Sequence, residues 1–262
     1  MTALAPEILA ALRQFDTCTV SNAIETFNVR LRDEGFTNAA IRCQFPHLPP
    51  LVGYAVTLRV RASGPPIDGR PPIERTDWWD HLLALPAPRI VVVQDLTDPP
   101  GLGSFIGEVH AHIFKALGCA GILTNGSVHD LPGIAATGLQ LFAGSVAVSH
   151  SYVHLIDFGR PVVLGGLTIA PGDLLHADLH GVVQVPPAVA AQIPVVAARL
   201  REHDRRLIAL CQSPDVTPAC LRAAPRPNSK PAPPRKISVT RKTTSSATFA
   251  SPTKTPPTCS RG

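Results

Sequence analysis

The chain has 262 residues, of which 45% are hydrophobic and 16% charged, and a formal net charge of +5. This length and apolar content support one sizeable core rather than two, and no apolar run is long and uncharged enough to span a bilayer. Residues 223–262 contain eight Lys or Arg and no Asp or Glu, so the first 222 residues carry a net charge of −3. A mildly acidic fold argues against a surface that grips nucleic acid specifically.

Residues 1–222 are therefore predicted to form one α/β domain, and residues 223–262 a disordered basic tail. The tail is rich in Pro, Ser, Thr and Lys, and it lacks the apolar surface needed to offset its chain entropy. The first seven residues show no basic or long apolar segment typical of an export signal, which predicts a cytoplasmic protein. The six cysteines form no C-x-x-C pair and are interpreted as free thiols, with Cys119 as a small core residue.

Hydrophobic periodicity and breaker residues predict an alternating order of elements. Helices are predicted over residues 6–15, 20–27, 78–85, 107–117 and 188–211. Strands are predicted over residues 51–62, 89–96 and 121–124, and strand-rich segments over residues 139–149 and 161–185. The glycine at 118 ends the fourth helix, and Asp16 to Thr19 supply cap residues for the second.

The order strand, helix, strand over residues 89–130 predicts two parallel strands joined by a right-handed crossover. Ligands of parallel sheets bind just beyond the carboxyl ends of the strands. Two loops fulfil that condition, and they bring Glu108 and Asp130 to one rim beside the helix that starts at Gly107. Two carboxylates beside a helix N-terminus suit a hard divalent cation together with a carboxylate or phosphate ligand.

Each of these features also has a simpler interpretation. Glu108 fits a first-turn charge that favours the helix dipole, and Asp130 fits a helix cap. The glycines at 101, 103 and 107 approach a dinucleotide fingerprint but have the wrong last gap. The pairs His110/His112, His150/His154 and His176/His180 could suggest zinc, although their predicted positions at strand ends and turns do not favour such a site.

Several short motifs together resemble the RraA-like family, which includes the 4-hydroxy-4-methyl-2-oxoglutarate aldolases. The resemblance covers residues 10–212, and its order and spacing are more specific than any single motif. The motifs are GEV at 107–109, ALGCAG at 116–121, TNGSVHD at 124–130, DTCTVSNA at 16–23, LVGYAVT at 51–57, VLGGLTI at 163–169, PGD at 171–173 and DLHGVVQVP at 178–186.

The resemblance implies a compact αββα sandwich of the swivelling-domain type, assembled as a homo-oligomer, a trimer or hexamer, with sites between subunits. The family signature is an acidic residue, twenty intervening residues and then Arg-Asp. Glu108 and Asp130 hold the two acidic positions at that spacing, and His129 stands where the family has Arg. By resemblance, Asp130 anchors Mg²⁺ or Mn²⁺.

The substrate-binding positions that the resemblance implies are Gly107, Glu108, Val109, His110 and His129. The N–H groups of residues 107–110 would hold a substrate carboxylate, and the Arg position would stabilise a pyruvate enolate. These roles imply a lyase that cleaves or decarboxylates a small 2-keto acid, with His129 and Glu108 as catalytic residues. Some relatives instead bind and inhibit a ribonuclease, and a catalytically weak protein-binding regulator is the alternative.

Overall fold

The computed structural model describes residues 3–70, 73 and 75–224. Its elements, in chain order, are α1 (Pro6–Leu12), α2 (Thr17–Glu25), β1 (Arg42–Cys43), β2 (Leu51–Arg61), the short 3₁₀ helix η1 (Ile67–Gly69), α3 (Arg75–Ala84), β3 (Arg89–Asp95), β4 (Ser104–Ile106), α4 (Glu108–Ala116), β5 (Cys119–Thr124), β6 (Ser127–Val128), α5 (Leu131–Ala136), β7 (Gln140–Ala143), β8 (Ser145–Val146), β9 (His154–Phe158), β10 (Val162–Leu164), β11 (Leu167–Ile169), β12 (Leu174–Asp178), β13 (Gly181–Gln184), α6 (Ile193–Cys211) and α7 (Pro218–Ala223).

The chain divides into two compact units between Ala198 and Arg199, inside α6. The first unit holds every strand, and the second holds the rest of α6 and α7. Apart from Ala223 and Ala224, the predicted tail lies outside the described residues. None of the helices among the described residues is long and apolar enough to cross a bilayer.

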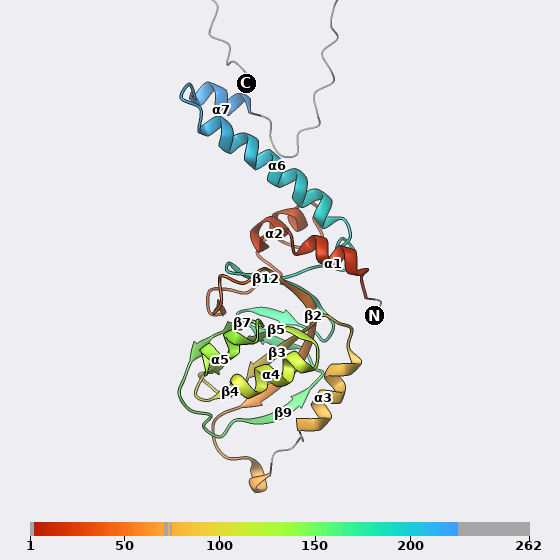
Figure 1. The fold of residues 1–262 in the computed structure, drawn as a ribbon, viewed down its shortest axis with the longest axis vertical. Helices are drawn as coiled ribbons and strands as arrows, with labels where there is room; N and C mark the ends of the chain where they lie inside the picture. Colours follow the sequence, from red (N-terminus) through yellow and green to blue (C-terminus); the bar gives the residue numbers. More distant parts are fainter. Residues whose placement is uncertain (1–2, 71–72, 74, 225–262) are drawn as a thin grey trace, which may run out of the picture. The chain divides into compact units, whose positions relative to one another are not determined.

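An eight-stranded sheet forms the centre of the first unit, in the order β1-β7-β5-β3-β2-β12-β13, with β9 also paired to β2. The four strands β2, β3, β5 and β7 are mutually parallel, and the outer strands pair antiparallel. Helices α3, α4 and α5 connect the parallel strands and lie on one side of the sheet (Figure 1). The predicted α/β class and the parallel pairing around residues 89–124 are therefore confirmed.

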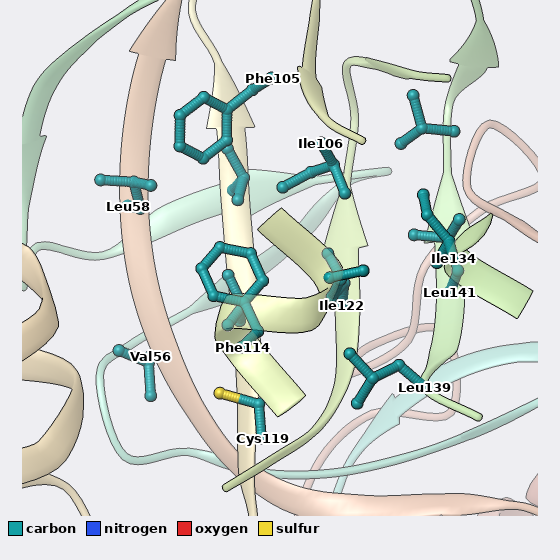
Figure 2. Close-up of a cluster of buried hydrophobic side chains, with 14 of the residues drawn as sticks. Val56, Leu58, Phe105, Ile106, Phe114, Cys119, Ile122, Ile134, Leu139 and Leu141 are labelled. Carbon is teal, nitrogen blue, oxygen red and sulfur yellow. The ribbon is translucent and has the colours of Figure 1, made fainter. Parts of the chain in front are cut away.

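Buried apolar side chains fill both faces of the sheet. On the helical face, Phe114 of α4 and Ile134 of α5 pack against Ile122 of β5 (Figure 2). On the other face, the hairpin of β10 and β11 covers a second apolar cluster. Cys119 is buried, as expected, and burial raises the pKa of its thiol to about 12. Each layer of the fold thus covers apolar sheet surface that water would otherwise contact.

Two predicted helix boundaries shift for identifiable reasons. Helix α2 begins at Thr17 rather than at residue 20, because the Asp16 carboxylate accepts the Thr19 N–H at 2.8 Å and caps the helix. Helix α6 begins at Ile193 rather than at residue 188. A helix from residue 188 would place Pro194 in its interior, where the ring clashes with the preceding turn; in the structure Pro194 lies in the first turn.

His176 is a fully buried histidine that ties α1 and α2 to β12. Its Nδ1 lies 3.0 Å from the Thr17 hydroxyl, and its Nε2 lies 3.2 Å from the Leu12 carbonyl oxygen. The Thr17 N–H donates to Asp178 at 2.8 Å. Burial lowers the pKa of His176 although the Asp178 and Asp16 carboxylates oppose the shift. The imidazole is therefore held neutral and fully hydrogen-bonded, which leaves it no free ring nitrogen for a metal.

This burial predicts a pH-dependent stability. Because the pKa of His176 is lower in the folded chain than its ordinary 6.5, the unfolded state binds the proton first, and the free energy of unfolding should decrease as the pH falls below 6.5. Urea unfolding of the full chain between pH 8 and pH 5.5 measures the slope. His176→Gln should flatten it, whereas the exposed control His47→Gln should not; equal slopes in all three proteins would contradict the assignment.

Candidate functional site

The carboxyl ends of β3, β5 and β7 meet at one edge of the sheet, and a second small sheet extends from them. Its strands β4, β6 and β8 follow β3, β5 and β7 respectively and pair in parallel. The Ser104 and Ser127 hydroxyl oxygens lie 3.0 Å apart and link β4 to β6. The loops expected to carry the site are thus ordered by strand pairing of their own.

Asp95 and Asn125 hold the base of these loops. The Asp95 N–H donates to the Asn125 side-chain oxygen at 2.7 Å, and the Asn125 amide donates back to the Asp95 carbonyl oxygen at 3.0 Å. The buried Asp95 carboxylate accepts the N–H groups of Thr97 and Gly101. These two polar residues of the predicted loops therefore have a structural role.

Gly107 lies at a close approach between the two loops. A Cβ atom at this position would stand 2.4 Å from His129 Nε2 and 2.9 Å from Asp130 Oδ2. Only glycine permits this approach without displacing one of those side chains. Gly107 is the N-cap residue of α4 and has no side chain that could accept a hydrogen bond from the first turn. The N–H groups of that turn therefore face the rim without a cap from Gly107.

Asp130 adopts a left-handed backbone conformation with φ of 55° at the start of α5. Its side chain does not cap α5; instead Oδ2 accepts the Glu108 N–H of α4 at 3.4 Å. Asp130 stands at the N-cap position of α5 while its carboxylate meets the first turn of α4, so a helix-cap role and a ligand-directed role both fit this position. The carboxylate is 54% exposed, so most of its oxygen lone pairs remain available to a ligand.

Glu108 lies at the same rim, in the first turn of α4. Its carboxylate is 55% exposed, and Oε1 is 4.0 Å from His112 Nε2. A Cβ on Gly133 would stand 2.5 Å from Glu108 Cδ, so the side chain lies against α5. The position fits both a helix-dipole charge and a ligand-directed carboxylate.

His129 is the least exposed of the three rim side chains, at 14%. Its Nε2 lies 3.6 Å from Asp130 Oδ2, and its ring meets His150 edge to face with centroids 4.3 Å apart. In the sequence, His150 stands out only as one member of the pair His150/His154, whose predicted position does not favour a zinc site. Ligands of parallel sheets bind beyond the carboxyl ends of the strands, and β7 is also one of the parallel strands. The segment after β7 therefore also lies at this edge, and it carries His150.

The last two predicted positions, Val109 and His110, lie in the first turn of α4. The Val109 side chain is 72% exposed, and the His110 ring lies 4.6 Å from the Phe105 ring and 5.9 Å from the Phe114 ring, centroid to centroid. The first turn of α4 thus offers its N–H groups at the rim while the His110 ring packs against core aromatics.

A magnesium-type ion fits these residues better than zinc does. No group of three or more His, Cys, Asp or Glu side chains within the described residues is close enough to hold a metal, whereas structural and catalytic zinc sites need at least three such ligands. Magnesium commonly uses one or two carboxylates and completes its shell with water and substrate oxygens. The exposed Asp130 and Glu108 carboxylates match that donor set.

The close approach at Gly107 gives a prediction that does not depend on activity. Gly107→Ala should lower the free energy of unfolding by about 1–3 kcal/mol, because the new methyl group overlaps the His129 ring. Adding His129→Ala should recover part of that loss, since the imidazole is then absent. A double-mutant cycle by urea unfolding measures the coupling; strictly additive losses would show that the two residues do not meet.

Comparison with known proteins bears on the same residues. A sequence model of the RraA-like family, described as Aldolase/RraA, matches residues 17–184. A protein of Halalkalibacterium halodurans provisionally named 4-hydroxy-4-methyl-2-oxoglutarate aldolase is 30% identical over 81 residues, which cover 30% of this chain and 39% of that protein. A protein of the same provisional name from Ectopseudomonas mendocina is 28% identical over 113 residues, 38% of this chain and 70% of that protein.

Solved structures share the fold at lower identity. An uncharacterized protein from Pseudomonas syringae pv. tomato matches with a TM-score of 0.64 and 23% identity, over 85% of this chain and 100% of that chain. RraAS2 of Streptomyces coelicolor, described as an unusual member of the RNase ES inhibitor RraA protein family, matches with a TM-score of 0.61 and 20% identity, over 81% and 100%. Because the family match spans most of the folded residues, including Glu108, His129 and Asp130, the chain belongs to the RraA-like family.

Proposed function

We propose that this protein is a divalent-metal-dependent lyase acting on a small 2-keto acid. The reaction would be aldol cleavage of a 4-hydroxy-2-keto acid or decarboxylation of an oxaloacetate-type acid, and both yield pyruvate through its enolate. One observation carries the proposal: the Asp130 carboxylate leaves its own helix uncapped and turns to the first turn of α4 beside Glu108. The aldolase names of two relatives favour the same class.

The N-terminus of α4 supports binding of the substrate's carboxylate. N–H groups at the start of a helix and the helix dipole both favour an anion, and the missing side chain of Gly107 lets His129 and Asp130 lie against this turn. His129, beside this turn, would donate a hydrogen bond to the same end of the substrate. The chain would in this way fix the keto-acid half of the molecule and leave the distal half toward solvent.

Asp130, with Glu108 beside it, would hold the Mg²⁺ or Mn²⁺ ion. When bound, the ion would supply a Lewis acid for the negative charge that develops on the 2-keto oxygen. The left-handed backbone of Asp130 and its contact with the Glu108 N–H orient the carboxylate toward the rim. The chain's contribution is to present oxygen donors beside the substrate carboxylate.

Proton transfer would fall to Glu108. In aldol cleavage the C4 hydroxyl loses its proton as the C3–C4 bond breaks and its electron pair passes to the enolate, which is then protonated at C3. An exposed carboxylate can accept the first proton through a water and return it. Lys115 is the only lysine among residues 1–222 and lies in the last turn of α4, away from the rim, so the geometry offers no Schiff-base nucleophile.

A second copy of the chain would complete the site. Glu108 and Asp130 are both more than half exposed. Exposed apolar side chains lie around the same edge of the sheet, in α4, in β8 and in the neighbouring loops: Leu102, Val109, Val146, Val148 and Tyr152. An open rim bordered by apolar residues favours burial against another protein surface. We therefore propose a homo-oligomer, and the resemblance to the RraA-like family implies a trimer or hexamer.

The primary test is Asp130→Asn. It should abolish Mg²⁺- or Mn²⁺-dependent pyruvate release from oxaloacetate and from a panel of 4-hydroxy-2-keto acids, because the amide loses the anionic donor. Thermal unfolding should change little, since the side chain is exposed. The matched control Asp33→Asn, also exposed, should keep full turnover, and a fully active Asp130→Asn would remove Asp130 from the site.

His129 gives a gain-of-function test. His129→Arg replaces a point donor with a permanently charged fork that binds a carboxylate in two places. It should raise kcat/KM by about ten-fold, which corresponds to one recovered charge-assisted hydrogen bond. His47→Arg serves as the control at an exposed histidine. An unchanged kcat/KM in His129→Arg would show that the side chain does not meet the substrate.

His129 in place of arginine also keeps a second function open, that of a catalytically weak protein that binds and regulates a partner such as a ribonuclease. The two functions differ in one outcome. A lyase releases pyruvate in the wild type and loses it with EDTA. A wild type and a His129→Arg variant that are both inert on every keto acid, together with inhibition of a ribonuclease, would favour the binding function.

A further inference from the structure

We propose that the amino end of the sheet, opposite the rim, holds a second binding site for a small carboxylate with an apolar body. A cavity of about 310 Å³ opens there. It is lined by Leu51, Cys119 and Gln140, the first residues of β2, β5 and β7. The proposed lyase site follows the carboxyl ends of β3, β5 and β7, so the two sites lie at opposite ends of the same parallel strands.

Two cations border this cavity. Arg13 follows α1, and Lys115 lies in the last turn of α4; both are exposed, and both line the cavity. No Asp or Glu belongs to the lining. Neither cation takes part in any ion pair found among the described residues. Two unpaired positive charges on one cavity favour an anionic ligand.

The remaining lining consists of apolar side chains and of a glutamine whose amide group already makes hydrogen bonds. Leu48, Pro49 and Leu51 form an apolar wall. The Gln140 amide donates to the Phe45 carbonyl oxygen at 3.2 Å, and its oxygen accepts the Leu141 N–H at 3.1 Å. Because the Gln140 side chain is already engaged, the body of the ligand would be apolar, and its charged end would lie between Arg13 and Lys115.

Lys115 also has a purely structural explanation, because a cation in the last turn of a helix offsets the helix dipole. The same explanation extends to Arg13, which is the C-cap of α1, but it does not account for the two cations lining one apolar cavity. It also predicts a different result: Lys115→Gln would lower stability without changing the affinity for an anion. The two accounts are therefore separable by measuring both quantities.

The test is an NMR titration of the ¹⁵N-labelled full chain with hexanoate. Acetate, which has the carboxylate without the apolar chain, and 1-hexanol, which has the apolar chain without the charge, serve as comparison ligands. Hexanoate should shift the amide signals of Leu51, Cys119 and Ala120, and acetate and hexanol should each shift them far less. Arg13→Gln and Lys115→Gln should each weaken hexanoate binding about five-fold. The exposed control Arg32→Gln should leave it unchanged.

Five results would overturn the proposal. Equal shifts with hexanol would show that charge plays no part, and equal shifts with acetate would show that the apolar wall plays none. Equal weakening by Arg32→Gln would show a nonspecific response to net charge. Shifts confined to residues 107–110 and 129–130 at the rim would place the carboxylate in the lyase site. Hexanoate shifts that vanish as protein concentration rises would show that a second copy covers the cavity.

Discussion

The parallel pairing of β3 with β5 is the constraint on which the site depends. It aligns the carboxyl ends of the two strands, and the crossover through α4 returns the chain on one face. The Asp95–Asn125 hydrogen bonds then fix the two following loops to each other. Only within this frame can Gly107 approach His129 and Asp130 so closely that a single added carbon would overlap them. The register of the sheet therefore determines the geometry of the loops, and the loops determine where the rim side chains lie.

Much of this arrangement follows from sequence, and the exceptions have physical causes. The run of apolar residues in β3, the stop at Gly118 and the spacing of Glu108 and Asp130 suffice to predict a parallel pair with carboxylates at its edge. The contact of His150 with His129 is invisible to periodicity, because it joins loops that are distant in sequence. The short strands β4 and β6 carry too few residues for any alternation to appear. The left-handed backbone at Asp130, which turns its carboxylate from α5 to α4, likewise depends on the folded loop.

The chemistry at the rim differs from the family signature at one position. A guanidinium would offer a fixed charge and two donors to a substrate carboxylate, whereas His129 is a mostly buried imidazole set between His150 and Asp130. That environment orients the ring. In the proposed lyase, the binding of negative charge would then fall to the first turn of α4 and to the divalent ion. The chain would thus retain Asp130 and Glu108 for the metal, whereas His129 would bind the substrate carboxylate more weakly than an arginine. Retained carboxylates favour the lyase function, and the loss of the arginine favours the binding function.

The most direct test of the central claim locates the metal itself. Mn²⁺ added to the ¹⁵N-labelled full chain with oxalate, a planar mimic of a pyruvate enolate, broadens the amide signals of nearby residues. We expect broadening centred on Gly107, Glu108 and Asp130, which should be lost in Asp130→Asn and unchanged in Asp33→Asn. Broadening centred elsewhere, such as on Asp178 and His180, or broadening that persists in Asp130→Asn, would contradict the placement of the metal at this rim.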